Sequence, residues 1–419
     1  MRSPIAIVGY NRPDYLRECL EALSRCNHVE EYEAFFFLDA PNRSKKDDIR
    51  LCDEVYGIAR NAGGVFKETH ILRSETHKGC RENVKDAFDH IFALFEAVIY
   101  IEDDIVVAPD FLDFMEDCLE KLRTDNRIFS ICGYTPKVLE GKDIKDDLVL
   151  IGLFTAWGIG LWRDRWEMVD YKKRDYHKDN ALMEGFKEYG YNLPNLLMAE
   201  EIDILDTWDV QVMLASFRFS MYTAYPRIPK CTNIGKYGVH SKDRYDGEDR
   251  PFYKNVDVWE WHIENLTVEK RLNDYMKSAA ASYDSYMDWK SSRPYWKYLA
   301  YNYVLKSIIR HKCEGIAIDG FFLENSIKKI LIYGFTDVGE ILCNELSNSS
   351  IKVLGYIDRN PELIGKRKNG IRIYSQPEEV EERCDAIIVT PLTDSYEIQE
   401  YLAQYIDARK IFTIAEILR

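Results

Sequence analysis

An apolar segment that ends in three consecutive acids constrains the fold of this chain most. Residues 98–101 are Val, Ile, Tyr and Ile, Glu102, Asp103 and Asp104 follow directly, and Pro109 closes a second short apolar run. This pattern predicts a buried strand that ends in a carboxylate cluster. Adjacent carboxylates repel one another unless a cation or hydrogen-bond donors compensate, and oxygen ligands suit Mg2+ or Mn2+. The cluster is therefore predicted to hold a metal; the alternative is a solvated acidic turn.

Strand-like and helix-like segments alternate along the first 125 residues. Asn11 is expected to cap the first helix, with Pro13 in its first turn. The alternation predicts an α/β domain with a mainly parallel sheet flanked by helices, in which ligands bind beyond the carboxyl ends of the strands. The expected strands are residues 3–10, 34–38, 70–72 and 98–104. The expected helices are residues 15–23, 81–95 and 110–122. A further helix after the second strand is expected to carry Ile49, Cys52, Val55 and Ile58 on one face.

Polar residues follow several of these strands directly. Asn11, Arg12 and Asp39 are expected to meet the acids 102–104 at one edge of the sheet, because each follows a strand. A guanidinium beside a metal-binding acid cluster suits a diphosphate, and Asp39 offers a hydrogen-bond acceptor to a base or ribose. Arg12 as a surface residue at a helix start, and Asp39 as a turn-former before Pro41, are the alternatives.

Two later segments add candidate residues. Gly158 and Gly160 are flanked by tryptophans, which suits either a backbone that approaches a ring-shaped ligand or the packing of a tight turn. A helix is expected to start with Asp206 or Thr207 as its cap. Asp209 in its first turn can take a proton from a sugar hydroxyl, or can simply complement the helix dipole.

The order of these motifs resembles that of GT-A fold glycosyltransferases over roughly residues 4 to 245. It is similar to bacterial family-2-like transferases and to the N-acetylglucosaminyltransferase I family, whose Asp-x-Asp signature also appears as Glu-Asp-Asp. The motifs that carry the resemblance are Asn11-Arg12, the strand ending at Asp39, His77-Lys78-Gly79 with Arg81 and Asn83, the segment 102–112, Trp157-Gly-Ile-Gly160, Thr207-Trp-Asp-Val-Gln211 and the run 233–240.

The resemblance implies an inverting transfer from a nucleotide-sugar donor, with a divalent metal, Mn2+ or Mg2+, held mainly by Asp104. It implies uracil contact from Asp39, hence a UDP-sugar, phosphate contact from Arg12 and a general base at Asp209, with Glu200 or Glu201 as the alternative base. His240 is expected to meet the metal or the diphosphate, unless it is structural. The full set expected to bind the donor is Asn11, Arg12, Asp39, Lys78, Arg81, Glu102, Asp103, Trp157 and Gly158.

Residues 265–325 are predicted to form a helical connector rich in aromatic residues. Between Lys290 and Lys312 the charged residues are all basic, in a chain with a formal net charge of -15. A basic aromatic helix suits either peripheral contact with an anionic membrane surface or packing between two domains.

From residue 326 a second α/β pattern begins. Strand 329–333, a glycine turn at 334–339, a helix and a second strand ending at Asp358 form a Rossmann arrangement, although Thr336 takes the place of the middle glycine. At least four strands are expected. The segment resembles small Rossmann-like domains of bacterial polysaccharide-biosynthesis enzymes, which implies nucleotide or nucleotide-sugar binding or a scaffolding role.

Composition bounds the setting of the protein. The acidic balance argues against nucleic-acid binding. The absence of a signal peptide and of a long apolar run predicts a cytoplasmic protein, with a peripheral position at the inner face of the membrane as the further option. Ten cysteines without a Cys-x-x-Cys pair predict reduced, mostly structural thiols.

These patterns together predict three parts: a GT-A domain at 1–264, the connector at 265–325 and a Rossmann-like domain at 326–419. The predicted function is glycosyl transfer to a glycan or lipid-linked glycan acceptor in bacterial surface polysaccharide biosynthesis. A nucleotidyltransferase is one alternative, although Gly9 is the lone glycine of the first turn. A non-catalytic scaffold of a polysaccharide assembly complex is the other.

Overall fold

The computed structural model describes residues 2–42, 45–135, 148–172, 174, 176–190, 193–201, 205–235, 267–268, 293–368 and 370–418. These fall into two compact units, neither of them continuous in sequence. The N-terminal unit comprises residues 1–171, 185–193 and 206–282, and the C-terminal unit residues 172–184, 194–205 and 283–419. The division at 264 and 325 stays a prediction.

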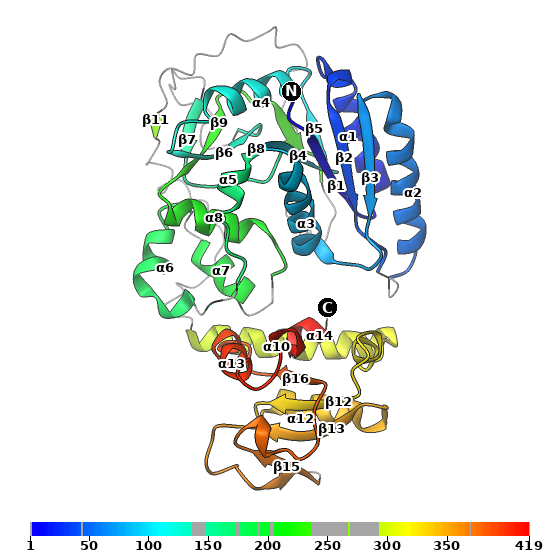
Figure 1. Ribbon diagram of the computed structural model, residues 1–419, viewed down its shortest axis with the longest axis vertical. Coiled ribbons are helices and arrows are strands. Elements are labelled where there is room, and N and C mark those ends of the chain that lie inside the picture. The colour runs from blue at the N-terminus through cyan, green and yellow to red at the C-terminus, as the bar shows by residue number, and fades with distance from the viewer. Residues whose placement is uncertain are drawn as a thin grey trace. The chain divides into compact units, whose positions relative to one another are not determined.

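The N-terminal unit is built on a nine-stranded sheet of order β11-β7-β9-β6-β8-β4-β1-β2-β3 (Figure 1). Its strands are β1 (Ile5–Gly9), β2 (Glu33–Leu38), β3 (Glu68–Arg73), β4 (Ala97–Glu102), β6 (Ile128–Cys132), β7 (Leu148–Ile151), β8 (Ile159–Trp162), β9 (Tyr222–Pro226) and β11 (Thr267–Val268). A two-stranded sheet pairs β5 (Ile105–Val107) with β10 (Cys231–Asn233). The helices of this unit are α1 (Pro13–Leu23), α2 (Asp48–Asn61), α3 (Gly79–Leu94), α4 (Phe111–Lys121), α5 (Arg163–Trp166) and α8 (Asp209–Arg218). α6 (Asn180–Phe186) and α7 (Leu193–Glu201) belong for the most part to the segments 172–184 and 194–205 of the C-terminal unit.

The first four strands confirm the predicted βαβ alternation. β1 pairs in parallel with β2 and β4, and β2 pairs in parallel with β3. β8 then inserts antiparallel between β4 and β6, and β7 runs antiparallel to β9, so the sheet is mixed. The parallel end of the sheet therefore holds the strands whose carboxyl ends were expected to form the site.

Alternating side chains of the strands divide the core into two layers. Ile7 on β1 and Phe36 on β2 join the core cluster that includes α1, α2 and α4. Phe35 and Phe37 face the other way and contact His90 on α3. Because successive residues of a strand alternate in direction, one sheet buries apolar surface against helices on both faces.

Three local expectations need correction. Arg12, and not Asn11, is the N-cap of α1, where no side chain caps the helix, although Pro13 does lie in the first turn. Trp208, and not Asp206 or Thr207, is the N-cap of α8. Ile49 is 53% exposed, because α2 turns Cys52, Val55 and Ala59 to the core instead.

The C-terminal unit carries a second sheet of order β14-β15-β13-β12-β16-β17. β15, β13, β12, β16 and β17 are parallel, in the order 3-2-1-4-5 of a Rossmann-like domain, which confirms the expectation of at least four strands. The strands are β12 (Lys329–Tyr333), β13 (Lys352–Ile357), β14 (Arg367–Lys368), β15 (Ile371–Tyr374), β16 (Ala386–Val389) and β17 (Ile411–Thr413), and the helices are α10 (Arg293–Glu314), α11 (Gly320–Glu324), α12 (Asp337–Glu345), α13 (Ser395–Leu402) and α14 (Ile414–Ile417).

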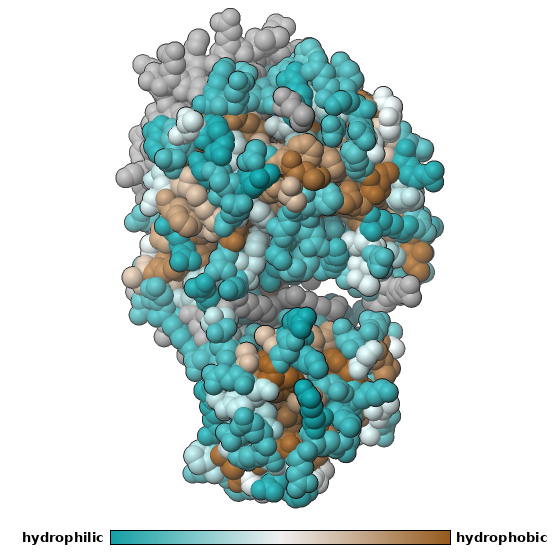
Figure 2. Space-filling view, in the orientation of Figure 1, coloured by the Kyte–Doolittle hydropathy of each residue, from teal (hydrophilic) through white to brown (hydrophobic). Residues whose placement is uncertain are grey.

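The surface and the cysteines agree with the composition. Hydrophilic side chains cover much of the face drawn in Figure 2. Within the described ranges, no helix has the length and apolar character needed to cross a membrane. All ten cysteines are described and are free thiols, most of them buried, as predicted.

Candidate functional site

The predicted gathering of charged residues at the carboxyl ends of β1 and β4 is present. Arg12 follows β1, and its Nη1 donates to Asp104 Oδ2 over 2.6 Å. Its Nε donates to Asp103 Oδ2 over 3.3 Å, and its Nη2 bonds Asp103 Oδ1. Arg12 is therefore a bridge between two carboxylates of the acid cluster, which is a different role from a surface residue at a helix start.

The acid cluster is crowded and shielded from water. Asp103 and Asp104 are buried, with 2% and 6% of their surface exposed. Glu102 accepts a hydrogen bond of 3.0 Å from Tyr100 Oη. Burial and repulsion from Asp104 raise the pKa of Glu102 to about 8. Burial likewise raises the pKa of Asp103, although Arg12 opposes the shift. One guanidinium thus does not fully compensate three carboxylates, and the cluster favours additional positive charge.

A residue more than 100 positions away completes the surroundings of Asp104. β10 pairs antiparallel with β5 so that Asn233 lies opposite Ile105. Asn233 Nδ2 donates to Asp104 Oδ1 over 3.2 Å, and the Asn233 amide oxygen accepts from Gly235 N over 2.7 Å. Nothing in the local sequence around Asn233 predicts this contact, because it depends on the pairing of two distant strands. His240 lies outside the described residues.

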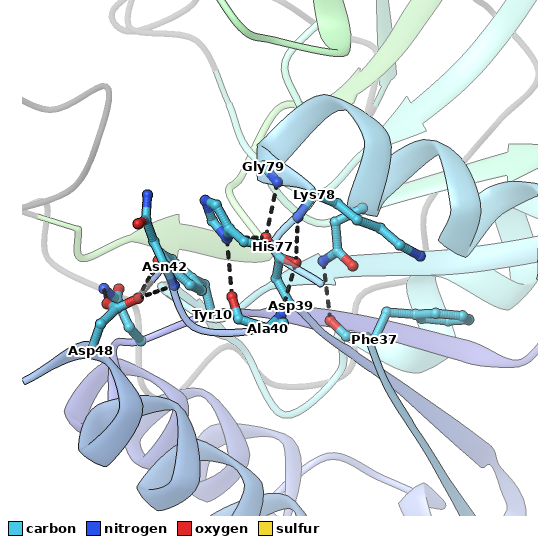
Figure 3. Close-up of polar contacts among 11 residues, drawn as sticks. Tyr10, Phe37, Asp39, Ala40, Asn42, Asp48, His77, Lys78 and Gly79 are labelled. Carbon is cyan, nitrogen blue, oxygen red and sulfur yellow. Dashed lines mark hydrogen bonds and ion pairs between the residues drawn. The ribbon is translucent and has the colours of Figure 1, made fainter. Parts of the chain in front are cut away.

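Asp39 lies after β2 and organises the turn that leads into α3 (Figure 3). Its Oδ1 accepts from Ala40 N and Lys78 N over 2.8 and 2.9 Å. Its Oδ2 accepts from Gly79 N over 3.0 Å and lies 2.9 Å from His77 Nδ1. A carboxylate has about four lone-pair sites, and all four are used here. Contact between Asp39 and a uracil would have to replace one of these bonds.

His77 joins this cluster to an aromatic residue. Its ring stacks on Tyr10 with centroids 4.9 Å apart, and its Nδ1 also lies 3.0 Å from Ala40 O. Burial lowers the pKa of His77, but the hydrogen bond and charge of Asp39 outweigh burial, so the pKa is raised. The turn is therefore strongest when His77 is protonated.

Asn11 contributes to a neighbouring network through Asp48, the first residue of α2. The Asp48 carboxylate accepts from Asn11 Nδ2, and also from Tyr10 Oη and, over 2.6 Å, from Asn42 N (Figure 3). Asp48 is 2% exposed and was not singled out from sequence. A buried acid at a helix start is visible only once the helix boundary is known.

Asp209 is the first residue of α8. Its carboxylate accepts a hydrogen bond from Thr207 Oγ1, which orients it at the start of the helix. Burial raises the pKa of the Cys80 thiol, and the charges of Glu102, Asp209 and Asp206 add to the shift. Asp209 and Glu102 are thus both among the charges that act on this thiol.

Arg81 fixes the segment before α8. Its Nε donates to Thr207 O over 3.1 Å and lies 3.6 Å from Asp206 Oδ1. Gly79, whose φ is +82°, leaves room for Asp206, since a Cβ at this position would lie 2.8 Å from Asp206 Oδ2. The buried Arg81 thus supports the start of α8, and the amine of Lys78 bonds Asp86 on α3.

The Trp157-Gly158 turn is packed against protein. Gly158 has a φ of +61°, and a Cβ there would lie 3.1 Å from both Cys231 Sγ and the Phe111 ring. Trp157 packs edge-on against Tyr134, with centroids 4.7 Å apart. Of the two interpretations given above for the glycines, the contacts of Gly158 favour a tightly packed turn.

The alternative bases lie in the C-terminal unit. Glu200 and Glu201 are buried at the end of α7, and Glu201 accepts a hydrogen bond from Tyr176 N. Both residues belong to the segment 194–205. Glu201 at least has a structural role in holding the backbone of that unit.

The glycine turn of the C-terminal unit is closed by its own side chains. Thr336 caps α12 by accepting from Gly339 N over 3.1 Å, and its hydroxyl lies 3.0 Å from that of Thr390. Asp358 Oδ2 accepts from Phe335 N over 2.8 Å. Nucleotide binding at this turn stays a prediction, and it would have to accommodate these contacts.

Comparison with known proteins gives distant similarities. Residues 326–412 match the model of the family described as C2185-like, N-terminal. Among curated proteins no match is found. Similar solved structures include residues 1–349 of TarS from S. aureus, with 13% identity, a TM-score of 0.34 and coverage of 54% of this chain and 58% of that chain.

Two further solved structures show the same level of similarity. The mannosyltransferase PcManGT from Pyrobaculum calidifontis, in complex with GDP-Man and Mn2+, has 13% identity and a TM-score of 0.30, over 52% of this chain and 69% of that chain. The galactosyltransferase LgtC, in complex with donor and acceptor sugar analogs, has 11% identity and a TM-score of 0.30, over 53% and 72%. This chain thus covers only 58% of the TarS fragment, and function has to be argued from its own side chains.

Proposed function

We propose that the N-terminal unit transfers a sugar from a nucleotide-sugar donor to a hydroxyl group of a glycan acceptor, with inversion, in bacterial surface polysaccharide biosynthesis. The observation that carries the proposal is the pairing of Arg12 with Asp103 and Asp104 of the acid cluster, at the carboxyl ends of β1 and β4. Ligands of open α/β sheets bind at this edge. A guanidinium beside several carboxylates suits a donor whose diphosphate brings a divalent cation.

The residues present fit Mn2+ or Mg2+. The cluster offers carboxylate oxygens from Glu102, Asp103 and Asp104, and burial together with repulsion from Asp104 raises the pKa of Glu102. Hard cations of this kind prefer oxygen ligands. When bound, such a cation stabilises the negative charge that develops on the leaving diphosphate. Asp104 remains our expected main ligand of the cation. When the cation replaces Arg12 at Asp104, the Arg12 guanidinium would turn toward the phosphates of the donor.

Asp209 is the proposed general base. Its carboxylate stands in the first turn of α8 and accepts a hydrogen bond from Thr207 Oγ1, and its charge acts together with that of Glu102 on the pKa of the Cys80 thiol. In this role it holds the acceptor hydroxyl and removes its proton as the oxygen attacks the anomeric carbon, which then inverts. Arg81 holds the segment that precedes Asp209 through its hydrogen bond to Thr207 O.

Uracil remains the proposed base of the donor nucleotide. Since the acceptor sites of Asp39 are filled by its own turn, we assign Asp39 first to positioning that turn, beside the stacked rings of Tyr10 and His77. The nucleotide would meet this turn at the same sheet edge as the acid cluster.

The test combines turnover and binding. Purified protein is incubated with UDP-sugars with and without Mn2+, and UDP affinity is measured by calorimetry. We expect turnover that depends on metal and is lost in Asp104→Asn, while Asp117→Asn, an exposed acid paired with Lys121, behaves as wild type. Turnover without metal would contradict the role of Asp104. Metal-dependent UDP affinity without turnover would instead favour the binding scaffold.

Asp209→Asn tests the base separately. We expect kcat to fall by about 10²–10⁴ with UDP affinity nearly unchanged, because a positioned base acts on the acceptor and not on the donor. A variant with ordinary kcat would move the role to another carboxylate, and Glu200→Gln and Glu201→Gln would then be measured in the same assay.

A further inference from the structure

A second group of potential metal ligands lies at the other end of the parallel strands. Glu33 begins β2, and Glu68 and His70 lie at the start of β3, which is the edge strand of the sheet. The acid cluster 102–104 follows the end of β4, which runs parallel to these strands through β1 and β2. Glu33, Glu68 and His70 therefore lie at the amino-terminal ends of the parallel strands, and the acid cluster lies at the carboxyl ends. The group at 33, 68 and 70 has no part in the proposed transfer.

Strand register places the three side chains on one face. Glu33 pairs with Glu68, and His70, two residues further along β3, pairs with Phe35. Residues i and i+2 of a strand point to the same side, and directly paired residues of neighbouring strands do so too. One ligand atom from each of Glu33, Glu68 and His70 lies within 4.8 Å of the others.

The imidazole of His70 is held in position by an aromatic contact. The His70 ring stacks on Phe35, with centroids 4.3 Å apart and planes 20° apart. Its Nε2 is shielded from solvent and has no hydrogen-bond partner among the residues that the structure describes. The nearest carboxylate oxygens, Glu33 Oε2 and Glu68 Oε1, lie 3.8 and 3.7 Å away, beyond hydrogen-bonding distance. A nitrogen that is aimed between two carboxylates without bonding either is suited to a shared cation.

The spacing and chemistry point to a transition metal. Two ligands that bind one Zn2+ at about 2.0–2.2 Å in a tetrahedral site lie roughly 3.5 Å apart, so the observed 3.7 and 3.8 Å need only small side-chain rotations. One imidazole nitrogen with two carboxylates suits Zn2+ better than Mg2+, which prefers oxygen ligands alone. Lys67 Nζ lies 3.2 Å from Glu33 Oε1 and so leaves the other oxygen of Glu33 facing His70.

We propose that Glu33, Glu68 and His70 form a binding site for Zn2+ or a similar transition-metal ion, with the remaining coordination supplied by water. The ion joins β3 to β2 through side chains from both strands. Because β3 is the last strand of this sheet within the described part of the chain, the ion stabilises the side of the sheet where backbone pairing ends.

The test uses Co2+ and Zn2+ on the full chain. We expect wild-type protein to bind one ion that His70→Gln and Glu68→Gln each weaken by about 100-fold or more, with loss of the Co2+ absorption bands of a nitrogen-containing site. His28→Gln is the matched control, because His28 is an exposed histidine 3.7 Å from a single acid, Glu31. Asp104→Asn should leave this ion in place, which separates the site from the acid cluster.

Thermal unfolding supplies a second readout. In an Asp104→Asn background, which removes the expected main ligand of the acid cluster, Zn2+ should raise the Tm of the otherwise unchanged protein and of His28→Gln. It should leave the Tm of His70→Gln and Glu68→Gln unchanged, while all four proteins melt alike in EDTA. The proposal is overturned if His70→Gln keeps the wild-type stoichiometry and Co2+ spectrum, or if His28→Gln lowers Co2+ affinity as much as His70→Gln does.

Discussion

Arg12 takes part in both the expected cation site and the expected contact with the donor diphosphate. In the structure its guanidinium bonds Asp103 and Asp104, the carboxylates that are expected to meet a cation. In the proposed transfer the same guanidinium contacts the donor diphosphate. A cation that binds Asp104 takes over the charge that Arg12 supplies there. In this proposal, metal binding at Asp104 releases the Arg12 guanidinium, which is then available to the phosphates. This coupling is called the exchange below.

Removing the charge of Arg12 should therefore affect metal and nucleotide in opposite directions. Without nucleotide, Arg12→Gln is expected to bind Mn2+ about tenfold more tightly or better, because a unit charge at hydrogen-bonding distance contributes on the order of 1–4 kcal/mol. In the presence of Mn2+ the same variant should bind UDP more weakly. Electron paramagnetic resonance of free Mn2+ measures the first effect and calorimetry the second. Arg12→Lys keeps the charge, so an equal gain of Mn2+ affinity in that variant would argue against the exchange.

Glycine at position 158 is required by its packing and its backbone. Gly158→Ala places a Cβ 3.1 Å from Cys231 Sγ and the Phe111 ring, at a φ of +61°. We expect a loss of about 1–3 kcal/mol in the free energy of unfolding, measured in urea. Gly57→Ala is the control: its Cβ would meet nothing within 4 Å in the interior of α2, and alanine is the better helix former by about 1 kcal/mol. Equal stability of the two variants would show that the packing around Gly158 relaxes without cost.

At the scale of elements, the turn from residue 77 to residue 79 joins β2 to α3 through one buried carboxylate. Asp39 accepts two backbone N–H groups from this turn and one from Ala40, and pairs with His77. The pKa of His77 is raised above its ordinary value of 6.5. The stabilisation is then complete below about pH 6.5 and is lost as the pH rises through the raised pKa.

His77→Gln should remove this pH dependence. Between about pH 6 and pH 8.5 the free energy of unfolding of wild type should fall by more than that of His77→Gln, and the His77 imidazole protons should titrate above 6.5 in NMR spectra. His28→Gln, at an exposed site, should follow the wild-type profile. A His77→Gln protein with the wild-type pH profile would mean that the Asp39 pair does not stabilise the turn.

Much of the strand and helix order of the N-terminal unit, and the position of its candidate site, can be predicted from the local sequence. Hydrophobic runs ending in Gly9, Asp39 and Glu102 predict parallel strands with polar residues at their carboxyl ends, because strand length and helix periodicity are local properties. The proximity of Arg12 and Asp104 is predicted from topology alone, because both residues follow neighbouring parallel strands. The strand, glycine turn, helix and strand at the start of the C-terminal α/β domain are predicted in the same way, whereas the order of its strands comes from the structure.

Contacts between distant strands could not be predicted. The antiparallel insertion of β8 between β4 and β6, and the pairing of β10 with β5 that brings Asn233 to Asp104, leave no periodic trace in the sequence. The sharing of Asp48 among Tyr10, Asn11 and Asn42 likewise depends on where α2 begins. The caps of α1 and α8 were assigned to the wrong residues because helix ends are set by tertiary packing as well as by side-chain preference.

At the scale of the whole molecule, the C-terminal unit draws on three stretches of chain. Residues 172–184 and 194–205 belong to it together with 283–419. Lys178 Nζ lies 2.8 Å from Glu397 and 3.5 Å from Asp394, on or beside α13. Ala300, Val304 and Ile308 of α10 are buried. The unit therefore cannot be removed at one position without leaving parts of itself behind.

A chain cut after residue 325 should consequently be defective. We expect it to lose solubility or to bind a hydrophobic dye, because the buried face of α10 and the segment around Lys178 lose their partners. Lys178→Ala in the full chain is the control, and it should change the free energy of unfolding by less than about 1 kcal/mol, since the ion pair is exposed. A truncated protein that is monomeric and melts cooperatively would show that residues 1–325 fold independently.

The bond between Asp104 and Asn233 also determines when the proposed site can form during folding. Its two residues are 129 positions apart, and Arg12 and Asp103 are 91 positions apart. Loops of this length close late, after local helices and the first strand pairs have formed. A chain that has formed only its local structure therefore has no assembled acid cluster. Nucleotide binding at that cluster would report the fully folded N-terminal unit and not an intermediate.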